Sequence, residues 1–370
     1  MSLTGPPALL LCALLLVPSL PLRADDKPSA SPTPAPTPIA EFKARAGMMT
    51  ATAISDDGRL VFTGEDDGLV TLWSVKTGGI VQKFPGHTSR EVFAAALLPD
   101  GKRGVTCGDD NQLIVWDLAT GKSLRQMSTG DAIPFVMSCT TDGALAATGC
   151  DDGEIAIWNL ANGRRVTTLR RHSSLCSVLF SPDGRTLAAG DSDGQVALWD
   201  TAHWAQRHAL PSADGASVGA LAFSPDSRLL ATGNQNGAGF VWNVAAGTQF
   251  SMFAGYAHPE VLPVPPVAPV FPGSTITPDN RSSILFLCFS LDAESIFGSI
   301  QDNPPRFWET KTGRFLGTGD WYEDTRFYIA RYGFTFATAA ITPGRDFIVT
   351  TKENLAQVWP VSFTPNSPPH

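Results

Sequence analysis

The chain has 370 residues, 43% of them hydrophobic, and a formal net charge of −8 at pH 7. This length and composition allow a sizeable buried core. The acidic balance, with no run of Lys or Arg, argues against nucleic acid as a partner, because phosphate binding needs a clustered basic surface.

Residues 1–24 resemble a secretory signal peptide. An apolar run from Ala8 to Val17 is followed by Pro18 and Pro21, and the small residue Ala24 precedes an acidic pair. We therefore expect cleavage and export to the periplasm or the extracellular space. The alternative is an uncleaved N-terminus that tethers a structural protein to a membrane.

Residues 25–38 form a linker rich in Pro, Ser and Thr, which cannot build a packed core and is expected to be disordered. We expect one ordered domain over residues 39–363 and a disordered tail over residues 364–370.

Removal of the signal would leave five cysteines, an odd number that forbids complete pairing. They are Cys107, Cys139, Cys150, Cys176 and Cys288. We interpret them as small buried hydrophobic residues, and the sequence indicates no particular disulfide. No His/Cys cluster has zinc spacing, so neither a metal nor a cofactor is predicted.

A repeating unit is clearest at Ser173–Asp200. Its apolar runs predict three short strands, at Leu175–Ser181, Arg185–Ala189 and Gln195–Trp199. A turn with Pro and Gly separates the first two, and Gly190–Gly194 is expected to form the second turn. A small sheet of this kind has to be stacked on copies of itself to be stable.

The copies are marked by a tryptophan that follows an apolar residue at the end of each unit. The first five are spaced by 41–43 residues, and insertions lengthen the last two gaps. These tryptophans are Trp73, Trp116, Trp158, Trp199, Trp242, Trp308 and Trp359.

With this period the chain resembles the WD40 family, whose blades are four-stranded sheets. The resemblance implies an all-β fold, a single seven-bladed β-propeller. Members of the family commonly close the ring with an N-terminal strand, so Ile39–Lys43 is expected to pair with Leu355–Val361 and complete the last blade. Closure would also remove two open sheet edges, and a closed ring favours a monomer.

In WD40 proteins a Ser/Thr–His–Asp network satisfies the indole N–H of the buried tryptophan. The second repeat supplies all four members of this network. The fourth supplies the acid, the histidine and the tryptophan but has Ala189 in place of the hydroxyl. The residues concerned are His87, Thr106, Asp110, Trp116, His172, Asp193 and Trp199. A His with Asp and Thr partners could suggest catalysis, but its recurrence with the repeat favours a structural role.

Acidic turns recur between the second and third strands of the units. We expect the first acid of each turn, namely Glu65 or Asp66, Asp109, Asp151 and Asp191, to point to solvent from one face of the ring. They are either ordinary turn residues or an acidic rim that attracts a basic partner or a divalent cation. No turn has the ligand density of a calcium loop.

Two insertions, at residues 256–283 and 317–333, interrupt the last repeats and would emerge on the same face as the acidic turns. They hold a set of aromatic residues and an arginine, a composition typical of interaction hot spots. The candidate binding residues are Tyr256, Trp321, Tyr322, Phe327, Tyr328, Arg331 and Tyr332. The alternative is that these side chains fold back over the gap between the blades.

The sequence therefore predicts an exported, non-catalytic scaffold that binds another protein through loops on one face of a WD40 propeller. The competing hypothesis is an enzyme or ligand-binding propeller that uses the central channel. That class needs ionisable residues from several blades to converge, and we find no nucleophile–base pair in the sequence.

Overall fold

The computed structural model describes residues 38–44, 47–88, 91–211, 215–254, 283–300, 303–318, 339–341, 347–352 and 354–360. Residues 36–370 form one compact unit, and residues 1–35 form another that lies outside the described residues. The expected signal and the C-terminal tail also lie outside them, as do the linker and both insertions apart from residues at their ends.

The described strands form seven four-stranded antiparallel sheets, and in six of them the strands follow chain order. The first three sheets are β2 (Met49–Ile54), β3 (Leu60–Glu65), β4 (Val70–Ser74) and β5 (Ile80–Phe84); β6 (Val92–Leu97), β7 (Arg103–Gly108), β8 (Gln112–Asp117) and β9 (Ser123–Ser128); and β10 (Pro134–Cys139), β11 (Leu145–Cys150), β12 (Glu154–Asn159) and β13 (Arg164–Arg170).

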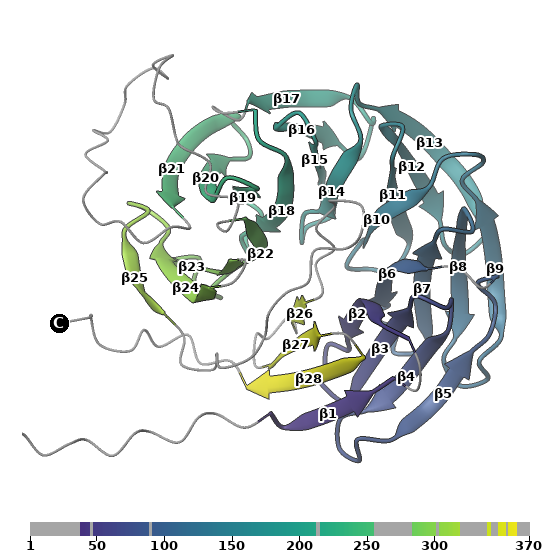
Figure 1. Ribbon diagram of the computed structural model, residues 1–370. Coiled ribbons are helices and arrows are strands. Elements are labelled where there is room, and N and C mark those ends of the chain that lie inside the picture. The colour runs from purple at the N-terminus through teal and green to yellow at the C-terminus, as the bar shows by residue number, and fades with distance from the viewer. Residues whose placement is uncertain are drawn as a thin grey trace, which may run out of the picture. The chain divides into compact units, whose positions relative to one another are not determined.

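The next three are β14 (Leu175–Phe180), β15 (Thr186–Asp191), β16 (Gln195–Asp200) and β17 (Gln206–Pro211); β18 (Val218–Phe223), β19 (Leu229–Asn234), β20 (Ala238–Asn243) and β21 (Thr248–Ala254); and β22 (Ile284–Phe289), β23 (Ser295–Ile300), β24 (Asn303–Glu309) and β25 (Phe315–Thr318). The first strand of each sheet lies toward the centre and the fourth lies at the rim (Figure 1). The sheets are the blades of a seven-bladed propeller, which confirms the predicted fold class.

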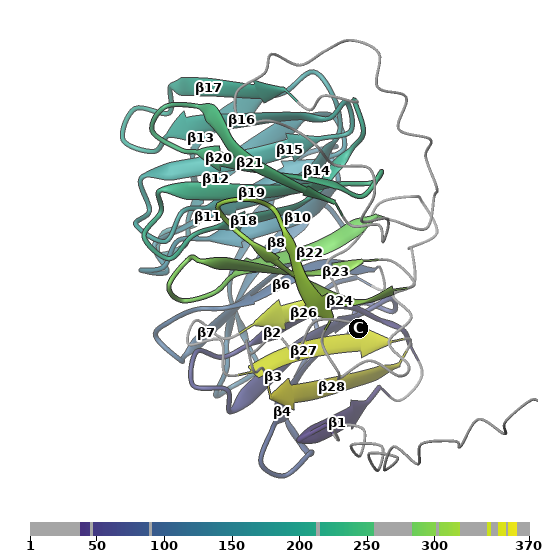
Figure 2. The same cartoon turned by 90° about the vertical axis from the view of Figure 1, so that its left-hand side faces the viewer.

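The seventh blade joins the two ends of the propeller. It contains β26 (Ala339–Ile341), β27 (Phe347–Lys352) and β28 (Leu355–Pro360), and its outer strand is β1 (Ala40–Lys43). β1 runs antiparallel beside β28, as both Figure 1 and Figure 2 show. The predicted closure by the N-terminal strand is therefore confirmed.

Apolar side chains pack between the blades rather than within them. Each of six hydrophobic clusters in the described residues joins two successive blades, counting the seventh and the first as neighbours. In each cluster the tryptophan of the later blade packs against the blade before it. The tryptophan spacing thus reflects one packing unit at each of these six blade interfaces.

The second strand of the fourth blade is longer than the sequence predicted. β15 continues through Gly190, which pairs with both β14 and β16, and Asp191, which pairs with Leu175 of β14. The turn therefore contains only Ser192–Gly194. Asp191 is therefore a strand residue, and its side chain points to one face of the sheet as the alternation of the strand dictates. This changes the expected role of Asp191, which the sequence had placed in a turn facing solvent.

Candidate functional site

Four side chains of the first two blades form a continuous hydrogen-bonded chain. Asp110 Oδ1 lies 2.9 Å from His87 Nδ1, and His87 Nε2 lies 2.7 Å from Thr106 Oγ1. Thr106 Oγ1 in turn accepts a hydrogen bond of 2.7 Å from Trp116 Nε1. The structure thus brings together all four residues that the sequence singled out in the second repeat.

The charge on Asp110 is favoured by its partners. Burial by itself raises the pKa of this carboxyl, but the hydrogen bond and charge of His87 and two backbone N–H groups lower the pKa overall. Both side chains of the pair are almost completely covered. We interpret the network as a structural link between the first and second blades rather than a reactive centre.

The tryptophan–threonine half of this network recurs without histidine. Trp73, Trp158 and Trp242 each donate to the threonine ten residues earlier, at distances of 2.8, 3.0 and 3.1 Å. In the sixth blade, where Gly298 occupies that position, Trp308 Nε1 donates to the Ala254 carbonyl at 3.0 Å instead. The recurrence supports a structural role for the threonine.

The fourth blade does not assemble the partial network expected from its sequence. His172 and Asp193 are both exposed, Asp193 accepts a hydrogen bond from Ser173, and neither joins the buried Trp199. Arg171, the residue before this histidine, instead forms an ion pair with Asp191. Sequence reasoning missed Arg171, whose only signal was its place beside a histidine that aligns with His87.

The acidic turns occupy equivalent positions in the first three blades. Asp66 and Asp151 are exposed, and Asp109 is half-buried. Asp66 Oδ1 accepts the N–H of Met48 at 3.0 Å, and Asp151 Oδ1 accepts the N–H of Ile133 at 3.0 Å. These aspartates therefore also hold the chain that enters the first strand of their own blade, a role the sequence did not reveal.

The prediction that Asp191 points to solvent as part of an acidic rim is wrong. Only 2% of its surface is exposed, because it ends β15 and faces the blade interface. Its Oδ2 binds Arg171, and its Oδ1 accepts the N–H of Gln195 at 2.8 Å. The position equivalent to Asp191 in the first blade is the buried Glu65, whereas Ser192 aligns with Asp66.

Glu91 joins the acidic surface, although sequence reasoning did not single it out. Burial is the largest cause that raises its pKa, and the charges of Asp66 and Asp109 raise it further. Carboxylates from the first and second blades thus lie close enough to repel one another. We define the acidic turn face as Asp66, Glu91, Asp109 and Asp151.

The part of the chain that the structure describes contains no group of three or more His, Cys, Asp or Glu side chains that could hold a metal ion. The divalent-cation version of the acidic rim therefore has no geometric support among these residues. All five cysteines of the described chain are free thiols.

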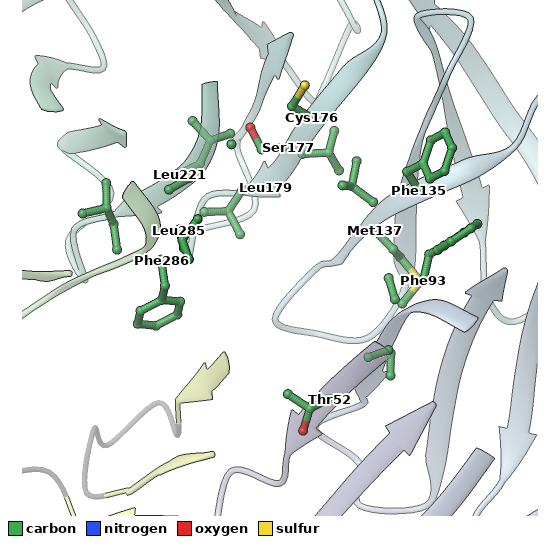
Figure 3. A pocket seen from close by; sticks show the side chains of 18 residues that line it. Thr52, Phe93, Phe135, Met137, Cys176, Ser177, Leu179, Leu221, Leu285 and Phe286 are labelled. Atoms are coloured by element: carbon green, nitrogen blue, oxygen red, sulfur yellow. The ribbon is translucent and has the colours of Figure 1, made fainter. Parts of the chain in front are cut away.

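The first strands of six blades line a central cavity of about 280 Å³ that is open to solvent. Its wall is mainly apolar, with Met137, Leu179 and Phe286 among the side chains around it (Figure 3). Cys176 is the ionisable residue among those that line it, and burial raises the pKa of its thiol. Among the described residues, this lining lacks the converging carboxylates or imidazoles that acid–base catalysis would need.

Residues 36–74, 78–117, 122–159, 163–200 and 205–243 each match the family described as "WD domain, G-beta repeat" (WD40), and together they cover more than half of the chain. This chain belongs to the WD40 repeat family. The sixth and seventh WD40 blades lie beyond the matched repeats and are identified by their strand order.

Two curated proteins are similar to parts of this WD40 chain. Protein groucho of Drosophila melanogaster is 33% identical over 112 residues, which are 30% of this chain and 15% of that protein. Guanine nucleotide-binding protein subunit beta-like protein 1 of Mus musculus is 34% identical over 64 residues, 17% of this chain and 20% of that protein. The matched part therefore spans a fifth or less of either relative.

WD40 repeat proteins serve as protein-interaction scaffolds. The candidate binding residues of the two insertions lie outside the described residues. They are Tyr256, Trp321, Tyr322, Phe327, Tyr328, Arg331 and Tyr332.

Across the described ranges, no helix has the length and apolar character needed to cross a membrane.

Proposed function

We propose that this WD40 propeller binds a partner protein through its acidic turn face, and that the partner presents Lys or Arg side chains. The observation that carries the proposal is the crowding of Asp66, Glu91 and Asp109 on one surface. Burial is the largest cause that raises the pKa of Glu91, and the charges of Asp66 and Asp109 raise it further. A cation placed among these carboxylates would relieve their repulsion.

The acidic turn face also has carboxylates available for a partner. Within the described residues, Asp66, Glu91 and Asp151 form no ion pair with Lys or Arg, whereas the neighbouring Asp152 pairs with Arg170. Carboxylates of one sign on a rigid surface attract an oppositely charged partner and speed its association. Binding should consequently weaken as the salt concentration rises.

The test is an affinity capture from native extract with the wild-type protein and a triple variant, Asp66→Asn/Glu91→Gln/Asp151→Asn. Asparagine keeps the oxygen that accepts the N–H of Met48 or Ile133, so the variant should fold. We expect the triple variant to lose a partner that the wild-type protein retains at low salt.

A second triple variant, Asp57→Asn/Asp142→Asn/Asp226→Asn, is the matched control. These three exposed aspartates lie in turns at the opposite end of the sheets, and the charge change is the same. A partner lost equally from both variants would show a general charge effect. A partner retained by both would rule out the acidic turn face.

We further propose that the protein acts after export, because residues 1–24 have the composition of a cleaved signal. N-terminal sequencing of the native protein tests this directly. A mature chain that starts at Asp25 supports export, whereas a chain that keeps residues 1–24 supports the membrane tether instead.

A further inference from the structure

A buried arginine in the sixth blade forms no ion pair with any carboxylate of the described residues. Arg306 lies in β24, and 6% of its surface is exposed. Its Nε forms no hydrogen bond, and no carboxylate among the described residues forms an ion pair with its guanidinium. The nearest acid in the strand, Glu309, is engaged by Arg314 and Thr312.

The propeller itself does not need a cation at this place. Arg306 stands two residues before the blade tryptophan, Trp308, and the same position is neutral in the other six repeats. The equivalent residues are Thr71, Ile114, Ala156, Ala197, Phe240 and Gln357. The arginine is therefore a feature of this blade alone and not a requirement of the repeat.

The surroundings fix the side chain without neutralising it. Because residues two apart in a strand share one face, Arg306 lies on the face of β24 that also carries Trp308. The guanidinium carbon lies 5.7 Å from the ring centroid of Phe315 in the neighbouring strand β25. An aromatic ring attracts the cation through its face but supplies no acceptor at the guanidinium edge, where the Nε–H is buried without a hydrogen bond.

Burial without a partner is unfavourable for a charged group, and it lowers the pKa of Arg306. Arginine stays protonated in proteins, so this cost is not avoided by loss of a proton. The usual compensation is an acceptor with two oxygens, which matches the planar fork of the guanidinium.

We propose that Arg306 is the anchor of an anion-binding site beside Phe315 in the sixth blade, and that the ligand is an oxyanion with two acceptor oxygens. Two sources supply such a group: a free phosphate ion and the carboxylate of an acidic peptide side chain. The site is distinct from the acidic turn face, whose charge would repel the same ligand.

The test measures the melting temperature of the mature protein as inorganic phosphate is added, with sodium chloride at matched ionic strength as the reference. Phosphate stabilises proteins in general by exclusion from their surface, so the informative quantity is the difference between variants. We expect a saturable rise in the wild-type protein and none in Arg306→Met. Arg314→Met, which removes an exposed arginine of the same blade, should behave as the wild type does.

A second arm replaces phosphate by a hexaglutamate peptide. Saturation by phosphate alone identifies a site for a free ion, and saturation by the peptide at lower concentration identifies a site for an acidic partner segment. The same phosphate response in wild type and Arg306→Met, or no saturable response of the wild type to either probe, would overturn the proposal.

The conservative variant Arg306→Lys keeps the test decisive if Arg306→Met does not fold. Lysine retains the charge but loses the fork, so half-saturation should need roughly 10-fold more phosphate, as expected for one lost charge-assisted hydrogen bond. Line broadening of the phosphate ³¹P resonance measures this binding without reference to stability. Equal broadening by wild type and Arg306→Lys would contradict the assigned geometry.

Discussion

Arg171 and Asp191 form a buried ion pair across the boundary between the third and fourth blades. The distance from Arg171 Nη2 to Asp191 Oδ2 is 2.8 Å, and the two side chains are 12% and 3% exposed. Arg171 follows the last strand of the third blade, as His87 follows that of the first. The pair thus joins the third and fourth blades, where no histidine network like that of His87 forms.

Removal of one partner of this ion pair should destabilise the folded protein. Arg171→Met leaves Asp191 buried and uncompensated, so we expect the free energy of unfolding to fall by about 3–5 kcal/mol. Urea denaturation measures the change. Arg164→Met, at an exposed arginine in the same region, should change it by less than about 0.5 kcal/mol.

The double variant Arg171→Met/Asp191→Asn separates charge from packing. Asparagine can still accept the N–H of Gln195, and no buried charge remains. We expect the double variant to be more stable than Arg171→Met alone. A double variant as unstable as the single one would show that packing of the arginine stem matters more than the ion pair.

The hydrogen-bonded chain around Thr106 makes a second prediction. Asp110→Ala removes the carboxylate that accepts from His87 Nδ1 and leaves this buried nitrogen without a partner. We expect the free energy of unfolding to fall by roughly 1–3 kcal/mol. Asp193→Ala is the matched control, because Asp193 is exposed and its neighbour His172 makes no such network. An unchanged melting temperature for Asp110→Ala would contradict the structural role of the network.

Closure of the ring can be tested at Phe42. Its side chain is 1% exposed and its ring centroid lies 5.6 Å from that of Trp73 in the first blade. Phe42→Ala should therefore destabilise the protein by about 3–5 kcal/mol in chemical denaturation. Ile39→Ala, at a half-exposed position beside the same strand, should have an effect below about 0.5 kcal/mol.

Glu65 predicts a dependence of stability on pH. Burial, followed by the charge of Asp67, raises the pKa of this carboxyl from 4.5 to about 7. A pKa raised by folding stabilises the folded state below about pH 4.5, and this contribution is lost as the pH rises through about 7.

The variant Glu65→Gln removes this proton linkage. Between pH 5 and pH 8 the wild-type protein should therefore lose stability relative to Glu65→Gln, by at most about 3 kcal/mol at about 1.4 kcal/mol per pKa unit. Urea denaturation at both pH values measures the difference. Parallel curves for the two proteins would show that Glu65 does not titrate in this range.

The repeat by itself determined the place of each tryptophan and the number of blades, whereas the closing strand was implied by the resemblance to the WD40 family. The first two follow from local signals, because a strand that ends in a tryptophan and a turn with Gly are set by nearby residues. The Thr–Trp pairing is similarly visible as a spacing of ten residues, as at Thr106 and Trp116.

Only the tertiary structure decided which acids reach solvent and which are buried. A shift of one residue at a strand end moves a side chain to the other face. Asp191 therefore faces Arg171, and the turn residue equivalent to Asp66 is Ser192. The charge repulsion between Asp66 and Glu91, and the absence of a described carboxylate paired with Arg306, likewise depend on the register between blades and strands. No spacing within one repeat encodes that register.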